Sequence, residues 1–405
     1  MEFLKSNLWE IKKSTALQIF GGLLGIVHTL TYWSWLSAGK LPLQYHANPQ
    51  PMCWSLFESC DWVKLLSPAL MEVIFHGFGV LAILSIGVFF FTRITGLGWF
   101  MLFLVLLFKG ILYIQDLRLS SNVNYAIFVL QFCYLFVPNK TNLLRWLLVS
   151  YYVASGLLKL SPNWLSGQWF VDQLHIPIKL GEWLAAVAVL AEMLAPVALF
   201  FRDLRNFLIS YFVLIAYHGL MWYADSYLEP MIMLVLLQLF PLLSYEERKT
   251  EREYLYQSFI RPEPSRVWLW IGLIAFWTVQ GLPYWPHHAS SSLRHLEYGM
   301  ALSPVAASQE CEQTTFLVYQ THMEEIDVSQ PTDRPTAFRC NPYLRFLDLK
   351  AVCRERANEP EFKTLMSYFQ IRNLKDKAFR PAFESDDFCS DQVTFSSLSG
   401  GSNGI

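Results

Sequence analysis

Between Ala16 and Trp285 the chain is a succession of apolar runs of roughly 17–25 residues, the length that an α-helix needs to cross a lipid bilayer. Only 16% of all residues are charged, against roughly 25% in soluble domains. Aromatic residues also make up 16% of the chain, and two of them, Trp and Tyr, are enriched at membrane–water interfaces in membrane proteins. The sequence therefore predicts a polytopic helical membrane protein that is embedded in the lipid bilayer.

We expect about nine spanning helices, at 15–38, 67–91, 94–114, 121–138, 143–160, 181–201, 206–224, 228–244 and 267–284. The chain then divides into an N-terminal segment (1–14), a transmembrane domain (15–285), a small α+β domain (286–395) and a flexible tail (396–405). In the α+β domain, the composition of residues 314–321 predicts a strand, and residues 358–374 are expected to form a helix.

Lysine and arginine are concentrated in alternate loops, from Lys5, Lys12 and Lys13 to the cluster at 248–266. Because cytoplasmic loops carry the excess of these residues, we expect a cytoplasmic N-terminus and a C-terminal domain outside. The net charge is −2 and no basic stripe is interleaved with aromatic residues, so nucleic acid is excluded as a partner.

Six of the seven cysteines fall on the predicted outer side of the membrane. They are Cys53 and Cys60 in the first outer loop, and Cys311, Cys340, Cys353 and Cys389 in the C-terminal domain. An oxidising compartment permits one disulfide in the loop and two in the domain. Their spacing matches no zinc pattern, so we predict no metal site.

Ionisable side chains inside the apolar runs are costly and therefore candidates for function. They are His28, Glu72, His76, Lys109, Lys159, Glu182, Glu192 and His218. Asp116, Asn122, Lys159, Trp164 and Glu182 fall at the outer boundary, whereas Glu192 and His218 lie two to three helical turns deeper. Together they predict a pocket that opens to the outside.

Each of these residues also has a structural interpretation. Lys159 at a helix end could extend along its helix to the lipid headgroups. Lys109 is expected to pair with Glu72 or another carboxylate, and His28 and His76 are expected to make helix–helix hydrogen bonds.

Four motifs appear in a fixed order along the chain. "YIQDLRLSSNVNYAIF" has an Asp, an Asn six residues later and a Tyr nine residues later; "ASGLLKLSPNWLSG" has the pattern Lys-Leu-x-x-x-Trp-x-x-Gly. "VLAEMLAPVALFFRD" and "YFVLIAYHGLMW" each place one ionisable residue in a helix. The positions are Asp116, Asn122, Tyr125, Lys159, Leu160, Trp164, Gly167, Glu192 and His218.

This set of motifs resembles the vitamin K-dependent γ-carboxylase and the related bacterial HTTM (horizontally transferred transmembrane) proteins, over about residues 15–290. The resemblance implies a bacterial inner-membrane protein that uses reduced vitamin K or menaquinol, with Lys159 as the base that deprotonates the quinol. It also implies that Glu192 and His218 orient the quinol. Where the carboxylase has a histidine between the Asn and the Tyr, this chain has Val123, so the family's carboxylation step lacks one of its residues.

Three classes of function remain open. The first is a quinol-using oxygenase, epoxidase or carboxylase, which in its carboxylating form is a lyase. The second is a non-catalytic scaffold or a lipid- or quinone-binding protein whose C-terminal domain docks an extracytoplasmic partner. The third is a thiol–disulfide partner that passes electrons to quinone, although the chain lacks the Cys-x-x-Cys motif of such proteins.

Overall fold

The computed structural model of the chain describes residues 2–37, 67–92, 94–115, 119, 122–138, 140–160, 162–200, 204–225, 228–249, 309–326, 340, 342–373, 378–390 and 393. The ninth expected span, at 267–284, lies outside these residues, and so do Cys53 and Cys60.

Helices occupy the first eight predicted spans and some of the segments between them. They are α1 (Glu2–Lys13), α2 (Thr15–Ser37), α4 (Pro68–Gly87) with a π-helical turn at Val88–Thr92, α5 (Thr95–Gln115), α6 (Asn122–Phe136), α7 (Lys140–Leu158), α8 (Pro162–Leu165), α9 (Gln168–Leu174), α10 (Ile178–Ala198), α11 (Leu204–Asp225), α12 (Leu228–Leu237) and α13 (Leu239–Lys249). Helices α1, α8 and α9 were not expected from the sequence.

Six helical stretches in the described part of the chain are long and apolar enough to cross a membrane. They are Thr15–Ser37, Ala69–Thr92, Thr95–Ile114, Ile178–Ala198, Leu204–Ala224 and Leu228–Glu246. Helix α6 has 15 residues, fewer than the roughly 20 that a span needs. Helix α7 has 19 residues but carries Lys140 and Arg145 in its first turns. The structure therefore supports an integral membrane protein and does not confirm nine spans.

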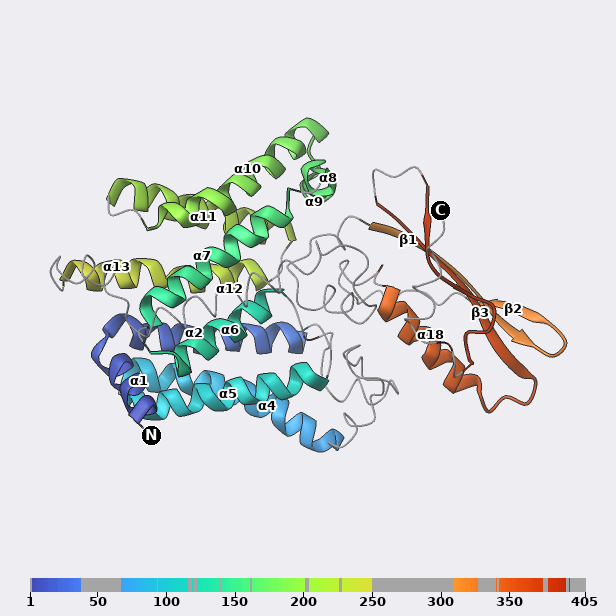
Figure 1. Cartoon of the computed structure of the whole chain (residues 1–405), viewed down its shortest axis with the longest axis horizontal. Helices are drawn as coiled ribbons and strands as arrows, with labels where there is room; N and C mark the ends of the chain where they lie inside the picture. Colours follow the sequence, from blue (N-terminus) through green and yellow to red (C-terminus); the bar gives the residue numbers. More distant parts are fainter. Residues whose placement is uncertain are drawn as a thin grey trace.

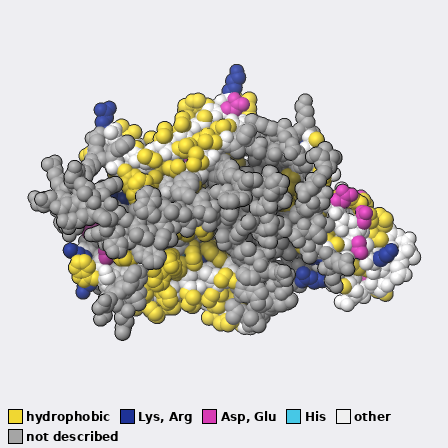
Figure 2. All heavy atoms as spheres, in the orientation of Figure 1, with side chains coloured by type: hydrophobic (Ala, Val, Ile, Leu, Met, Phe, Trp, Pro, Cys, Tyr) yellow, Lys and Arg dark blue, Asp and Glu magenta, His cyan; other side chains and the backbone are white. Residues whose placement is uncertain are grey.

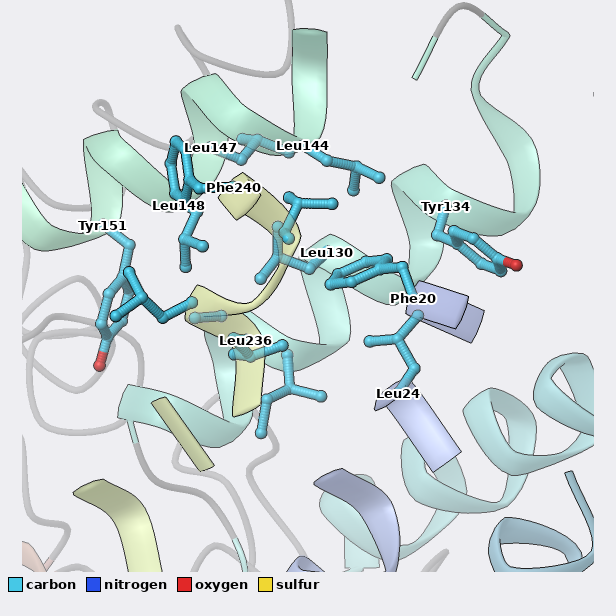
Figure 3. Packing of buried hydrophobic residues seen from close by; sticks show 14 of the residues in the cluster. Phe20, Leu24, Leu130, Tyr134, Leu144, Leu147, Leu148, Tyr151, Leu236 and Phe240 are labelled. Atoms are coloured by element: carbon cyan, nitrogen blue, oxygen red, sulfur yellow. The ribbon is translucent and has the colours of Figure 1, made fainter. Parts of the chain in front are cut away.

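The helices pack into one bundle (Figure 1). Helix α4 packs between α2 and α5, helix α10 packs against α7 and α11, and α12 contacts both α11 and α2. Buried side chains from α2, α6, α7, α12 and α13 meet in the core, as Figure 3 shows for Phe20, Leu24, Leu130, Tyr134, Leu144, Leu147, Leu148, Tyr151, Leu236 and Phe240. This core fixes the position of α7, whose end at Leu158 leads directly into Lys159, the first residue of the candidate site.

Many large apolar side chains point away from this core. Val80 and Phe91 are exposed on α4 and its π-helical turn, and Trp183, Leu194 and Phe212 are exposed on α10 and α11. Figure 2 shows hydrophobic side chains over the outer faces of the bundle, both on the side of α4 and on the side of α10 and α11. Contiguous apolar surface of this kind suits contact with lipid rather than with water.

The C-terminal domain is a four-stranded antiparallel sheet in the order β2-β1-β3-β4 with one helix, which confirms an α+β fold. The strands are β1 (Gln309–Tyr319), β2 (Met323–Ile326), β3 (Phe362–Asn373) and β4 (Arg380–Ser385), and the helix is α18 (Pro342–Arg356). The two predicted disulfides join Cys311 to Cys340 and Cys353 to Cys389. They tie β1 to the start of α18 and α18 to the segment after β4.

The helix expected at 358–374 is wrong, because this segment contains strand β3. Leu365, Ser367 and Phe369 are buried at alternate positions, which is the period of a strand. Leu365 lies opposite Leu317 of β1, which is also buried. The strand expected at 314–321 is confirmed for residues 314–319, which belong to β1, whereas residues 320 and 321 lie in the turn before β2.

Candidate functional site

Lys159, in the turn directly after α7, meets Glu192 of α10 and Tyr217 of α11. The Lys159 ammonium donates to Glu192 Oε1 at 2.7 Å and to the Tyr217 hydroxyl at 2.9 Å. The Tyr217 hydroxyl donates to the same Glu192 Oε1 at 2.7 Å. The three groups therefore form a closed ring of hydrogen bonds, which we call the Lys159 cluster.

The cluster is shielded from solvent. The Lys159 side chain is 13% exposed and that of Glu192 is 5% exposed. The Lys159 ammonium also lies 5.0 Å from the centre of the Trp164 ring and 5.6 Å from that of Tyr217, within reach of cation–π attraction. Lys159 is thus directed toward α10 and α11.

One carboxylate oxygen of the cluster has no partner. Glu192 Oε2 is buried, and no described residue donates a hydrogen bond to it. A buried carboxylate oxygen without a donor costs free energy, so such an atom marks a place where a ligand or water can donate. The ammonium likewise uses two of its three N–H groups within the cluster.

A second polar pair lies beside the cluster. His218 follows Tyr217 on α11, and its Nε2 is 2.7 Å from the hydroxyl of Tyr152 on α7. Both side chains are buried, and the rings of Tyr217 and His218 have their centres 5.0 Å apart. His218 is therefore placed to exchange a hydrogen bond with Tyr152 next to the ion pair.

Glycines allow the backbones to approach at two points of the site. A Cβ atom at Gly156 on α7 would lie 2.6 Å from Met193 Cγ and 3.3 Å from Glu192 Cβ. Gly167 has φ +67°, and a Cβ atom there would lie 2.1 Å from the Gly181 carbonyl carbon of α10. The glycine of the Lys-Leu-x-x-x-Trp-x-x-Gly motif thus holds the segment after Lys159 against the helix that carries Glu192.

The other predicted site residues are distributed differently. Trp164, on α8, reaches the Lys159 ammonium, and Tyr125 is half-buried on α6. Glu182 is exposed near the start of α10, about 15 Å along the helix from Glu192 at 1.5 Å per residue. Asp116 lies outside the described residues, and Asn122 begins α6 with a side chain that is not described.

Sequence reasoning missed Tyr217 and Tyr152, which complete the two hydrogen-bonded groups. Within the apolar runs, burial cost had selected only side chains that ionise near neutral pH, and tyrosine is not one of them. A tyrosine directly before a candidate histidine, as in "AYH" at 216–218, was the available signal.

Within the described ranges, no group of three or more His, Cys, Asp or Glu side chains could hold a metal ion. Comparisons of the chain with known protein families, with curated proteins and with solved structures find no match. The function must therefore be inferred from the chemistry of the site. A buried amine, carboxylate and phenol in mutual hydrogen-bond contact can accept, hold and pass on a proton.

Proposed function

We propose that the chain is a membrane enzyme that takes a proton from a hydroxyl group of a lipid-soluble substrate of the quinol type, with Lys159 as the base. The observation that carries this proposal is the buried Glu192 Oε2, which has no donor among the described residues. A quinol hydroxyl is a donor that matches this acceptor. The apolar helices around the cluster suit the hydrocarbon part of such a substrate.

The cluster can supply a neutral amine without solvent. Transfer of one proton from Lys159 Nζ to Glu192 Oε1 along their 2.7 Å hydrogen bond converts the ion pair into an amine and a carboxylic acid. The amine can then accept the substrate proton while Tyr217 keeps Glu192 in position.

The resemblance to the vitamin K-dependent γ-carboxylase and HTTM proteins makes reduced vitamin K or menaquinol the substrate to test. With oxygen, such a quinol yields the quinone epoxide and one water. Carboxylation of an acceptor is a further step of the family, for which this chain has Val123 in place of a histidine. We further propose a bacterial inner membrane, with the C-terminal domain outside and available to an extracytoplasmic partner.

The four cysteines of the C-terminal domain favour this proposal over thiol–disulfide exchange. All four are joined in disulfides, and the one free cysteine among the described residues is Cys133, buried in α6. Among the described residues, no exposed cysteine is therefore free to act as the attacking thiolate of such exchange.

Mass spectrometry of quinone products tests the proposal. Purified protein is given reduced vitamin K or menaquinol with oxygen, beside Lys159→Ala and the control Lys179→Ala, which removes an exposed lysine from α10. We expect epoxide from the wild type and from Lys179→Ala, and a loss of about 100-fold or more in Lys159→Ala. Equal turnover by Lys159→Ala would show that Lys159 is not the base.

A bound quinone that is never turned over would favour the non-catalytic alternative. In that case co-purified quinone is expected in the wild type, with no epoxide after addition of quinol and oxygen. The C-terminal domain would then be expected to dock an extracytoplasmic partner.

A further inference from the structure

A second group of buried polar side chains lies in the other half of the bundle. His28 of α2, Lys109 of α5 and Gln131 of α6 are each fully buried. Helix α5, which carries Lys109, packs against both α2 and α6, and Lys109 and Gln131 lie close enough to influence the His28 imidazole. No residue of the Lys159 cluster belongs to this group, which we call the Lys109 cluster.

The Lys109 cluster is unsatisfied as it stands. Lys109 Nζ, both ring nitrogens of His28 and Gln131 Oε1 make no hydrogen bond to any described residue. The Gln131 amide nitrogen is already used, since it donates to the Leu102 carbonyl at 2.8 Å. This hydrogen bond fixes the amide, so that Oε1 remains an acceptor for one of the neighbouring donors.

The charge of Lys109 has no counter-ion in the described part of the chain. Glu72, the carboxylate expected to pair with it, instead lies 3.9 Å from His76 Nε2, and both of those side chains are substantially exposed. The Tyr113 ring, 5.4 Å from the ammonium, supplies only a cation–π contact. A fully buried ammonium without a counter-ion is strongly unfavourable, and removal from water is the main reason.

An aromatic side chain packs directly against the cluster. The His28 ring packs edge-to-face on Phe78, with ring centres 5.7 Å apart, and Phe78 is itself fully buried. A water molecule would satisfy hydrogen bonds but would leave the positive charge uncompensated. A monovalent anion satisfies the donors and neutralises the ammonium at the same time.

We infer that the Lys109 cluster is a binding site for a small monovalent anion between α2, α5 and α6. Lys109 supplies the charge and two N–H groups, and His28 supplies a further N–H group. This inference does not depend on the quinol chemistry proposed for the Lys159 cluster.

Chloride binding to the full-length protein tests the inference. The line width of the chloride-35 NMR signal is measured as purified protein is added, at constant ionic strength with gluconate as the replacing anion. We expect broadening that saturates with chloride and is reversed by nitrate. Lys109→Met and His28→Phe are expected to weaken chloride binding at least tenfold, whereas Lys179→Met leaves it unchanged.

Thermal unfolding gives a second readout in the same samples. The midpoint of the wild type is expected to rise with chloride to a plateau, because an anion that binds only the folded state stabilises it. Lys109→Met is expected to show no chloride response and to be at least as stable as the wild type without chloride, since the unpaired charge is gone.

Two results would overturn the inference. One is the absence of saturable broadening in the wild type, which needs no variant to fold. The other is chloride binding of unchanged affinity in folded Lys109→Met, which would place the anion elsewhere.

Discussion

The ion pair of Lys159 and Glu192 predicts a strong energetic coupling between α7 and α10. At 2.7 Å and an effective dielectric constant of about 20, the attraction between two unit charges is about 6 kcal/mol. Both side chains are mostly buried, so water screens the pair weakly, but the cost of removing both charges from water offsets part of this attraction. Removing one partner of such a pair typically costs about 3–5 kcal/mol, because the other charge stays buried alone.

A double-mutant cycle measures this coupling. Lys159→Met and Glu192→Leu are each expected to lower the free energy of unfolding by about 3–5 kcal/mol. The double variant removes both charges, so it should cost about 2–3 kcal/mol less than the sum of the two single variants. Unfolding is followed by tryptophan fluorescence as sodium dodecyl sulfate is added to protein in mixed micelles. If the two effects add within about 0.5 kcal/mol, the pair does not carry the coupling that we assign to it.

Three further predictions concern the packing of the site and the C-terminal domain. Gly167→Ala should destabilise the bundle by about 2–4 kcal/mol, measured in the same unfolding assay, because its φ of +67° and its contact with α10 leave no room for a Cβ atom. Loss of the disulfide in Cys353→Ser or Cys389→Ser should destabilise the C-terminal domain by about 2–5 kcal/mol, measured by hydrogen exchange of β3. The hydrogen bond from Arg356 holds the pKa of the Glu359 carboxyl below its usual value. This contact therefore stabilises the domain at pH values above the pKa of Glu359 in the unfolded chain. The stabilisation is lost as the pH falls through the lowered pKa of the folded protein. Glu359→Gln should remove that part of the acid dependence in a pH series of the same exchange measurement.

Matched variants provide the controls. Alanine at Gly219 of α11 would meet no atom within 4 Å, so it should leave stability unchanged or raise it by up to about 1 kcal/mol. Cys133→Ser removes the free cysteine of α6 and should not change exchange in β3. Glu361→Gln removes an exposed neighbouring carboxylate and should leave the acid dependence as it is. Equal effects of a control and its partner variant would contradict the corresponding prediction.

The helical domain could be predicted because its signal is local. An apolar run of about 20 residues must hydrogen-bond its own backbone in lipid, so length and composition were enough to place α2, α4 and α5. Helix α1 lacks such a run, since Asn7, Lys12 and Lys13 interrupt it, and it was therefore missed.

The strand β3 was mistaken for a helix because its sequence satisfies both periods. Asn358 and the two glutamates that follow it resemble a helix start, while the buried residues at 365, 367 and 369 have the period of a strand. Pairing with β1 makes this segment a strand and not a helix. Leu365 pairs with Leu317, which lies 48 residues earlier in the chain, and the local sequence pattern does not reveal a partner at that distance.

The candidate site was predicted in part for a related reason. Burial cost alone singled out Lys159, Glu192 and His218. It could not show that Lys159 and Glu192 form a pair that shares Tyr217, because this depends on how closely α7 approaches α10 at Gly156. The same reasoning expected a carboxylate for Lys109, and the bundle provides none among its described residues.

The assembly of the Lys159 cluster from three segments of the chain has a consequence for biosynthesis. Lys159 leaves the ribosome 33 residues before Glu192 and 58 before Tyr217, so at about 5–20 residues per second its counter-ion follows roughly 2–7 seconds later. Trp164 follows after only five residues and can cover the ammonium during that interval. Lys159 therefore gains its carboxylate partner only after α10 has been synthesised.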